Sequence, residues 1–485
     1  MAVQGCAHGD LDAVYARLGE MERAEGCKVD LLICCGDFQA VRNLWDLQCM
    51  AVPRKYKAMH SFWKYYAGVV RAPVLTLFVG GNHEASNHLW ELPFGGWVAP
   101  NIYYLGDAGV VRFGGLRVAG LSGIYNSRSY HTLKFERPPY ADRHTLRTAY
   151  HVRDFDVQRL MQLASRKKKP FKRPREESEE ARPVLDAFFS HDWPQRIAEF
   201  GDTAALLRRK VFLRKEIAAG TLGNPAAMAL LKALQPARWF SAHMHVRFEA
   251  YVPHTEAAVD SAAGPPAGRP PATRFLALDK CLGRRPCMEI VNFDVDTEVE
   301  VDARGVPLPP SLEYDDEWLA VTRAWHPLRT TATAEGRNWA PPEEGPPDLE
   351  EHLAAVRRGF EGGKQGSRRI SEFDFFRTQP IHDPRLEMTS EKIRLEAIHN
   401  LRDRQVRSPT DNPQTRSMLK LLGLPPDPAD FFVHPRGTRT ALTADAAAFE
   451  HRPAASTAAF AMVGGMLPRP LSRPQTPRDG PDRGA

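Results

Sequence analysis

The sequence predicts a mixed α/β sandwich over about the first 250 residues, and three patterns point to this fold class. Four apolar runs have the length of strands that are buried on both faces of a sheet, and each run ends in polar residues. A helical repeat of apolar residues precedes the first run, and short strands joined by glycine turns lie in the middle of the region. The four runs are Val29 to Asp37, Ala72 to Asn82, Pro183 to Asp192 and Ala237 to His245.

The first helix is predicted between Asp10 and Gly26. Asp10 is a favourable N-cap residue, and glycine suits the position after the last turn. With a short strand before Gly5 and the run from Val29, this helix completes a βαβ unit. The apolar residues at helical spacing are Leu11, Val14, Tyr15, Leu18 and Met21, and the strands joined by glycine turns follow from Asn101 to Tyr125.

Beyond Arg247, three apolar segments are expected to complete the second sheet, and a mainly helical region follows them. Helical spacing with charged outer faces occurs from Asp348 to Glu361 and from Glu391 to Arg407. We therefore expect a first domain in residues 1–250, completing strands in 251–300 and a small accessory domain in 301–434. The three segments are Phe248 to Val252, Arg274 to Cys281 and Met288 to Val295.

Three segments do not fit a packed core. Residues 166–180 form a basic block followed by an acidic one, which is typical of a charged insertion loop. Residues 255–273 are rich in proline and small residues and are also expected to form a loop. Residues 435–485 contain few large apolar residues and are expected to form a disordered tail.

The composition indicates a soluble intracellular protein. No apolar stretch approaches the roughly 20 residues of a membrane helix, and the N-terminus lacks the pattern of a signal peptide. The seven cysteines are odd in number, and the adjacent Cys34 and Cys35 lie inside an apolar run, as reduced core thiols do. The formal charge of +6 suits a polyanionic partner but does not by itself indicate nucleic acid.

Side chains that can bind metals follow the predicted strands, at the point where each strand ends. In an open α/β sheet these ends border a common crevice, so residues distant in the sequence converge there. The side chains offer N, O and S donors, which suit Zn, Fe or Mn better than Ca or Mg. Seven donors are too many for one tetrahedral ion and therefore predict a pair of ions. The seven are Cys6, His8, Asp37, Asn82, His191, His243 and His245.

Each fragment also has a purely structural interpretation when it is taken alone. A single histidine at a strand end is more often a hydrogen-bonding residue than a ligand, and Cys6 fits an ordinary buried thiol. Asp37 suits a turn after Gly36, and the alternation of His243 and His245 occurs fairly often by chance. Five fragments at five successive strand ends together favour the binuclear site.

The order of these fragments resembles the calcineurin-like metallophosphoesterase superfamily, whose pattern is D-x-H, G-D, G-N-H-[DE], a lone His and G-H-x-H. The resemblance covers residues 5–245 and implies a β-sandwich flanked by helices. Two positions depart from the pattern, because Cys6 stands in place of the first Asp and Ala242 in place of the usual Gly.

With Cys6, further segments as far as Trp318 are similar to the family of RNA lariat debranching enzymes, and Thr410 to Thr415 resembles that family's C-terminal region. This second resemblance implies that residues 301–434 form the family's C-terminal domain. The segments are Cys34 to Asn43, Gly80 to Gly106, Ser122 to Tyr125, Pro138 to Tyr140, Tyr150 to Arg153, Phe188 to Pro194 and Phe275 to Leu282.

The resemblance implies how the seven donors divide between two ions. Asp37 bridges them, since one carboxylate can span ions roughly 3.5 to 4 Å apart. The first ion is held by Asp37 with Cys6, His8 and His245, and the second by Asp37 with Asn82, His191 and His243. A thiolate is a softer ligand than a carboxylate, so Cys6 favours Zn or Fe(II) over Mn in the first position, although Mn remains an alternative.

The resemblance also implies metal-assisted hydrolysis of the 2′,5′-phosphodiester bond at the branch of an intron lariat. His83 directly follows a ligand without being one in the family, so it is predicted to be the general acid, with Glu84 orienting it. Residues 122–153 occupy the place of the family's lariat-recognition loop, and their aromatic and basic side chains suit RNA. The predicted substrate contacts are His88, Tyr125, Tyr140, Arg147 and Arg153; packing is the alternative for His88, and an ordinary basic surface loop is the alternative for the rest.

Two other functions remain open at this stage. A broader metallophosphoesterase, such as a nuclease or a protein phosphatase, would share the superfamily's ligands, and a non-catalytic scaffold would keep only the fold. The scaffold is disfavoured because every ligand position holds a residue that can bind metal. The debranching function predicts branched RNA and spliceosome-associated proteins as partners, no membrane association and a nuclear location. The basic run Lys167 to Arg175 then has three interpretations: an import signal, an RNA-affinity loop or a solvated insert.

Overall fold

The computed structural model describes most of the first 424 residues, and contacts group Met1–Val433 into one compact unit. The described residues are 1–138, 140, 142–165, 184–254, 272–293, 304, 310–335, 339–362, 367–384 and 412–424. The insertion loop predicted at 166–180, the helix predicted at 391–407 and the tail predicted at 435–485 lie outside them. Most of the loop predicted at 255–273 does as well.

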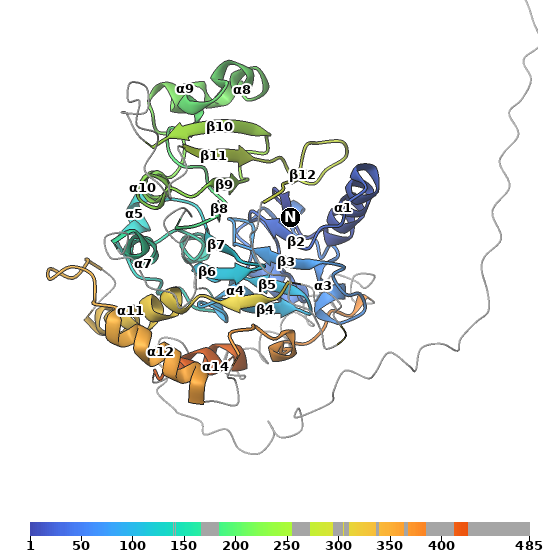
Figure 1. The fold of residues 1–485 in the computed structure, drawn as a ribbon. Coiled ribbons are helices and arrows are strands. Elements are labelled where there is room, and N and C mark those ends of the chain that lie inside the picture. The colour runs from blue at the N-terminus through green and yellow to red at the C-terminus, as the bar shows by residue number, and fades with distance from the viewer. Residues whose placement is uncertain are drawn as a thin grey trace, which may run out of the picture. The chain divides into compact units, whose positions relative to one another are not determined.

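Two sheets form the centre of the fold (Figure 1). The six-stranded sheet has the order β12-β1-β2-β3-β5-β4, and the seven-stranded sheet has the order β10-β11-β9-β8-β7-β6-β13. The strands of the first are β1 (Ala2–Gln4), β2 (Leu31–Cys34), β3 (Leu75–Phe78), β4 (Gly96–Ala99), β5 (Ile102–Tyr104) and β12 (Met288–Ile290). Those of the second are β6 (Ala108–Phe113), β7 (Leu116–Leu121), β8 (Ala187–Ser190), β9 (Arg238–Ser241), β10 (Phe248–Pro253), β11 (Ala272–Ala277) and β13 (Leu312–Tyr314).

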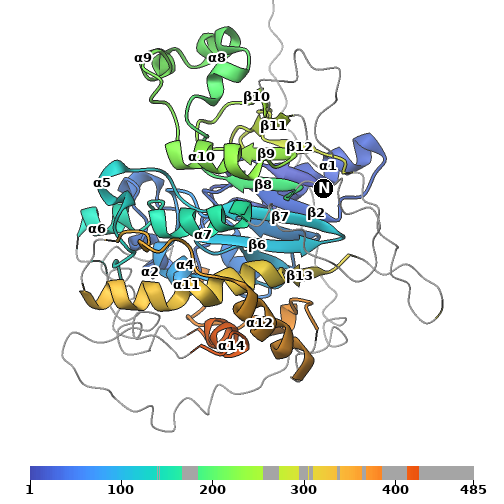
Figure 2. The ribbon, with the colours of Figure 1, turned by 60° about the vertical axis from the view of Figure 1, so that its left-hand side comes forward.

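Helices cover the outer faces of both sheets (Figure 2). Helices α1 (Leu11–Glu25) and α3 (Phe62–Tyr66) pack on the six-stranded sheet, and α7 (Asp154–Ser165), α10 (Pro225–Leu234) and α11 (Asp316–Glu335) pack on the other. The remaining helices are α2 (Leu44–Gln48), α4 (Ser86–Trp90), α5 (Ser127–Tyr130), α6 (Arg143–Thr148), α8 (Thr203–Arg209), α9 (Arg214–Ala218), α12 (Glu350–Gly362) and α14 (Pro413–Leu421). In the part of the chain that the structure describes, the short 3-10 turns are η1 (Arg54–Tyr56), η4 (Ile197–Phe200), η5 (Val211–Leu213) and η7 (Glu372–Asp374).

The continuous apolar runs have a direct structural cause. In β2, Leu31 and Ile33 face the core between the sheets, whereas Leu32 and Cys34 face the core beneath α1. Because both faces of the strand are covered, no position in it is left for a polar residue. The fold class predicted from these runs, a mixed α/β sandwich flanked by helices, is therefore confirmed.

The first helix follows its sequence signals closely. The Asp10 side chain accepts a hydrogen bond from the backbone N–H of Ala13, and Gly26 ends the helix with a left-handed φ of 64°. Both caps satisfy backbone groups that the helix leaves unpaired at its ends. The glycine turns between β5, β6 and β7 also lie where the sequence predicts them.

One predicted strand belongs to the other sheet. Strands β10 and β11 extend the seven-stranded sheet as expected, but β12 pairs antiparallel with β1 at the edge of the six-stranded sheet. The sequence pattern of Met288 to Val295 indicates a strand without indicating its partner. The loop between β11 and β12 therefore passes from one sheet to the other, close to the end of β1.

The C-terminal region is tied to the sandwich by a strand and by ion pairs. Strand β13 pairs with β6, and the buried Asp315 carboxylate lies 2.7 Å from Arg117 Nη2 and 3.0 Å from Arg112 Nε. Helix α11 packs against α7 and α12, and α14 packs against α12 and β4. Gln414 exchanges two hydrogen bonds with the backbone of Trp97 in β4. Helix α12 confirms the helical prediction for residues 348–361.

All seven cysteines are free thiols, and Cys34 and Cys35 are buried as predicted. Among the described helices, none combines the length and the apolar composition that a membrane span requires.

Candidate metal centre

The predicted metal-binding residues follow five strands from the two sheets. Strands β1, β2 and β3 lead into Cys6 and His8, Asp37, and Asn82, respectively. Strands β8 and β9 of the other sheet lead into His191 and into the pair His243 and His245. The parallel strands within each sheet end at the same edge, so the sheets bring these loops together.

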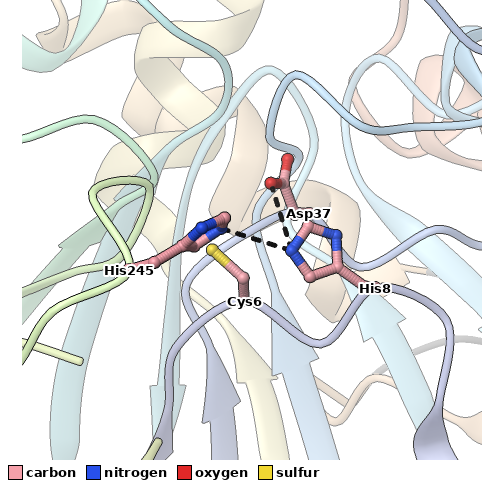
Figure 3. Close-up of side chains that lie close together, drawn as sticks. All are labelled: Cys6, His8, Asp37 and His245. Atoms are coloured by element: carbon pink, nitrogen blue, oxygen red, sulfur yellow. Dashed lines mark hydrogen bonds and ion pairs between the residues drawn. The ribbon is translucent and has the colours of Figure 1, made fainter. Parts of the chain in front are cut away.

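Four of the donors form one group (Figure 3). The ligand atoms of Cys6, His8, Asp37 and His245 all lie within 4.8 Å of one another. The Nε2 atoms of His8 and His245 are 3.3 Å apart, and Figure 3 shows the Cys6 thiol beside them. One carboxylate, one thiol and two imidazoles match the ligands of zinc and iron sites, so the group fits a divalent transition metal.

The other three donors form a second group on the opposite side of Asp37. His191 Nε2 lies 3.2 Å from Asn82 Oδ1 and 3.2 Å from His243 Nδ1. The Nδ1 atom of His191 lies 2.8 Å from the carbonyl oxygen of Cys35, a contact that places the ring proton on Nδ1 and leaves Nε2 free as a ligand. This group also has the composition of a transition-metal site.

Asp37 lies between the two groups. Its Oδ2 atom is 3.9 Å from His8 Nε2, whereas its Oδ1 atom is 3.3 Å from His191 Nε2. Each carboxylate oxygen therefore faces a different set of histidines. This is the arrangement that a bridging carboxylate needs, and it agrees with the division of ligands that the family resemblance implies.

The backbone around these residues is strained. Four non-glycine residues of the centre have a left-handed backbone: Asp37 (φ 44°), His8 (φ 52°), His243 (φ 59°) and His245 (φ 49°). Such conformations cost of the order of 1 kcal/mol each and persist where the surrounding structure enforces them. Their concentration at one place marks a functional site.

Two glycines allow the loops to approach one another closely. A Cβ atom on Gly36 would lie 2.4 Å from His191 Nδ1, and a Cβ atom on Gly81 would lie 2.3 Å from Asp37 Oδ1. Gly36 also has a φ of 98°. Neither glycine was assigned to the site from the sequence, although both precede predicted ligands within the quoted motifs.

The charges of the donors suit a cation. Burial lowers the pKa of His191 and of His245 to about 4, so both rings are neutral near pH 7. Burial also raises the pKa of the Cys6 thiol, which therefore needs a bound cation in order to ionise. Burial alone would raise the pKa of Asp37, but the surrounding histidines outweigh it and hold that pKa well below its usual range. Neutral imidazoles and an anionic carboxylate are the protonation states of metal ligands.

Glu84 has a different role from the predicted one. Its Oε1 atom accepts hydrogen bonds from the N–H groups of Phe38 (2.7 Å) and Gly81 (2.9 Å), and its Oε2 atom accepts one from Gln39 (2.9 Å). Both oxygens thus hold the backbone of the loops that carry Asp37 and Asn82. These contacts assign Glu84 to joining the two loops and not to orienting the His83 ring.

His83 lies beside the donors, as predicted. Its backbone N–H donates to Asp37 Oδ1 at 2.8 Å, and its ring centroid is 5.2 Å from that of His8. The side chain is partly exposed, unlike the neighbouring Glu84. It is therefore accessible to a substrate that reaches the first group of donors.

Two of the predicted substrate contacts are at least partly exposed. The N–H of Tyr125 donates to Asp192 Oδ2 at 3.1 Å, next to His191, and its ring lies 5.3 Å from that of Tyr130. Arg147 is exposed in α6. Through Tyr125, the predicted loop approaches the metal centre from the side of His191.

Arg153 is buried inside the loop and does not face the substrate. Its guanidinium lies 2.6 Å from the Glu136 carboxylate and 2.8 Å from the carbonyl oxygens of Ser129 and Thr148. Only 1% of its surface is exposed. The prediction of a substrate contact is therefore corrected: Arg153 neutralises Glu136 and holds the loop together.

His88 packs against protein. His88 Nδ1 lies 2.8 Å from the carbonyl oxygen of Ala40, its ring lies near those of Phe62 and Tyr66, and burial lowers its pKa to about 3. Packing, the alternative interpretation, therefore applies to His88. Tyr140 packs against a small cluster formed by Trp45, Cys49 and Leu146, where burial raises its pKa, and it also lines a cavity beside Gly80 and Gly81. Its contact with the substrate stays a prediction.

Comparisons with known proteins agree with this geometry. The calcineurin-like phosphoesterase family matches residues 1–247, and the C-terminal domain of the lariat debranching enzyme family matches residues 270–427. The lariat debranching enzyme of Arabidopsis thaliana is 44% identical over 431 residues, which are 88% of this chain and 86% of that protein. This chain belongs to the lariat debranching enzyme family.

Animal members of the family are also similar to this chain. The lariat debranching enzyme of Homo sapiens is 43% identical over 429 residues, which are 87% of this chain and 69% of that protein. That of Danio rerio is 49% identical over 344 residues, which are 71% of this chain but 54% of that protein. The chain thus aligns with about half the length of the Danio protein. The family match through residue 427 includes the region that contains β13, α11, α12 and α14.

Proposed function

We propose that this chain is an RNA lariat debranching enzyme, which hydrolyses the 2′,5′-phosphodiester bond at the branch point of an excised intron. The observation that carries the proposal is the placement of Asp37, whose two oxygens face two separate groups of donors. That geometry is what two-metal phosphodiester hydrolysis needs, and it occurs in a member of the lariat debranching enzyme family.

The donors divide between two ions in this proposal. Cys6, His8, Asp37 and His245 would hold one, and Asp37, Asn82, His191 and His243 would hold the other. Two divalent ions bound there would supply a nucleophile at neutral pH and neutralise charge on the phosphoryl group. The thiolate of Cys6 favours Fe(II) or Zn in the first position, because soft ligands select these metals over Mn.

The chain's own residues then have separate tasks. His83 protonates the 2′-oxygen of the branch nucleotide as it leaves, since its ring is partly exposed beside the His8 donor. Glu84 keeps the loops of Asp37 and Asn82 in register. Tyr125 and Arg147 contact the RNA around the branch, where an aromatic ring and a cation suit an unpaired base and a phosphate. The product is one linear intron that carries a 5′-phosphate and a free 2′-hydroxyl at the former branch nucleotide.

The test is cleavage of a synthetic branched RNA by the purified chain, with a linear RNA of the same composition as the control. We expect the enzyme to cleave only the branched RNA, and a chelator to abolish this cleavage.

A His83→Ala variant should lose about 10²- to 10⁴-fold in kcat, the usual contribution of a general acid. Comparable rates on linear RNA, duplex DNA or an aryl phosphate would instead indicate a broader phosphoesterase, and near-normal turnover by His83→Ala would exclude that residue as the acid.

The proposal extends to location and partners. Excised introns arise in the nucleus, so the chain is proposed to act there, close to spliceosome-associated proteins. The basic run from Lys167 to Arg175 is proposed to direct import. In a fluorescent fusion, replacing Lys167, Lys168 and Lys169 with Gln should shift the protein to the cytoplasm. Unchanged nuclear accumulation would rule out this segment as the signal.

A further inference from the structure

A second exposed surface lies beside the metal centre and combines apolar and basic side chains. We call it the basic edge and define it by Lys210 and Phe212 near η5, and by Lys280, Leu282 and Arg285 in the loop between β11 and β12. Phe212 is 72% exposed and Leu282 is 57% exposed. Further exposed cations flank Phe212 in the chain: Arg208, Arg209, Arg214 and Lys215. None of these residues was assigned a function from the sequence.

The basic edge is continuous with the metal centre. The N–H of Cys281 donates to the carbonyl oxygen of Cys6 at 3.1 Å, so the loop between β11 and β12 lies directly against the end of β1. Lys280 directly precedes Cys281, and its backbone N–H donates to Asp279 Oδ1 at 2.7 Å. A basic residue therefore stands in the loop segment that contacts the end of β1.

The same loop lies within electrostatic range of the helical projection formed by α8, η5 and α9. Burial lowers the pKa of Lys210, Asp279 opposes this, and the charges of Arg285 and Lys280 lower it further. Lys210, Lys280 and Arg285 are thus neighbours of one another. Asp279, which faces these cations, is buried and binds Arg285 Nη1 at 3.1 Å. The basic edge keeps a net positive charge.

Phe212 lies beside Lys210. Lys210 Nζ lies 5.9 Å from the centre of the Phe212 ring, a cation–π contact that limits the ring's freedom. Exposed aromatic rings beside a track of cations are typical of surfaces that bind single-stranded nucleic acid, because bases stack on the ring while cations contact phosphates. Apolar exposure of this kind next to a functional site indicates an interaction surface.

We infer that the basic edge binds one single-stranded arm of the branched RNA, with a base stacked on Phe212 and phosphates near Lys210 and Lys280. The inference rests on the proposed function. A branch nucleotide joins three strands, whereas a linear RNA presents two at any nucleotide. Through Tyr125, the loop of residues 122–153 approaches the centre from the side of His191, and Figure 2 shows its helices α5 and α6 away from α8 and α9. The basic edge thus provides a second surface along which a strand of the RNA can bind, beside the first group of donors.

The experiment compares two substrates of the full chain. One is a branched RNA with arms of about eight nucleotides, and the other carries a single nucleotide on each arm. The Phe212→Ala variant should raise KM for the long-armed RNA about tenfold, as expected for the loss of one stacked base, and leave kcat unchanged. It should leave both constants for the short-armed RNA unchanged, and Phe212→Trp should restore KM. The binding constant for RNA falls as the salt concentration rises. In a plot of log binding constant against log salt concentration, Lys210→Gln should make the slope shallower by about 0.7.

A matched control comes from the C-terminal region. Phe373 is 92% exposed like Phe212, but its neighbours in η7 are Glu372 and Asp374. The Phe373→Ala variant should leave KM for both substrates unchanged. The inference would be overturned if Phe212→Ala and Phe373→Ala changed KM equally, or if Phe212→Ala raised KM equally for the two RNAs. It would also be overturned if Phe212→Ala left the RNA kinetics unchanged but lost a bound partner protein.

The outcome also separates this inference from the proposed function. If the wild-type chain hydrolyses an aryl phosphate but cleaves neither branched RNA, debranching is excluded. The basic edge is then tested by fluorescence anisotropy with a single-stranded RNA. Lower affinity of the Phe212→Ala variant, but not of Phe373→Ala, would support an RNA surface, and unchanged affinity would overturn it.

Discussion

The two groups of donors around Asp37 differ in how the protein holds them. In the first group the His8 side chain is 24% exposed, whereas His191 of the second group has no exposed surface. The His191 ring is held by the Cys35 carbonyl and by the close backbone of Gly36, while His8 lies at an open edge. The comparison teaches that the position of His191 depends on the packing around it more than that of His8 does.

The largest expected effect follows from removing the buried ligand. A His191→Ala variant loses the Nε2 atom that lies 3.3 Å from Asp37 Oδ1. Mutation of a residue that only supports a metal ligand typically lowers activity roughly 10- to 100-fold. The kcat/KM of His191→Ala on branched RNA should fall by more than this, because a ligand itself is removed. Bound metal, measured by mass spectrometry, should fall by one equivalent. The His8→Ala variant should lose less, and an equal or greater loss in that variant would contradict the difference between the groups.

A smaller effect is expected from crowding the buried ligand without removing it. In Gly36→Ala the new Cβ would lie 2.4 Å from His191 Nδ1, so the ring must move and kcat/KM should fall roughly 10- to 100-fold. Gly26→Ala is the matched control, because Gly26 also has a left-handed φ but its Cβ would meet no atom within 4 Å. That control should cost about 1 kcal/mol in the free energy of unfolding and leave kcat unchanged. Equal activities of the two variants would contradict a steric role for Gly36.

The metal preference at the first group of donors should depend on the chemical type of its ligands more than on the space around them. A Cys6→Asp variant exchanges a thiolate for a carboxylate, and should remain active while its preference shifts from Zn or Fe(II) toward Mn. The measurement is the ratio of kcat/KM with each metal added to the stripped protein. Cys34→Ala, at a buried thiol in β2, is the control and should leave that ratio unchanged. An unchanged ratio in Cys6→Asp would remove Cys6 from the ligands.

The smallest effect on activity is expected far from both groups, at the attachment of the C-terminal region. Burial would raise the pKa of Asp315, but Arg117 and Arg112 outweigh it and lower that pKa to about 2. Because the folded-state pKa lies below the unfolded value of 3.8, the ion pairs contribute stability above about pH 4 that is lost as the pH falls toward 2. Asp315→Asn removes the buried negative charge that faces Arg117 and Arg112 and should cost about 3 kcal/mol at pH 7, measured by urea unfolding.

The stability difference between wild type and Asp315→Asn should shrink from pH 5 to pH 2. A constant difference over this range would exclude Asp315 as the titrating group. At 25 °C and pH 7 the variant should bind as much metal as the wild type, because the site is built from other strands.

The candidate site shows where sequence reasoning succeeds and where it stops. Cys6, His8, Asp37, Asn82, His191, His243 and His245 were found because each follows an apolar run, and parallel strands end at a common edge. Glu84, His88 and Arg153 also have ionisable side chains that suggested a role in catalysis or substrate binding. In the structure, all three instead form hydrogen bonds or ion pairs inside the protein. Residue type and spacing do not tell which way a side chain points.

The sequence by itself determined most of the strands, the capped first helix, the family resemblance and the set of candidate donors, because these depend on local patterns of apolar and polar residues. Only the tertiary structure decided that β12 joins the first sheet, that β13 adds a strand from the C-terminal region, that Gly36 and Gly81 make room for His191 and Asp37, and that the loop with Lys280 lies against the end of β1. These features depend on contacts between segments far apart in the chain. Each of them comes from packing, in which a side chain's role is set by the neighbours that the fold brings to it.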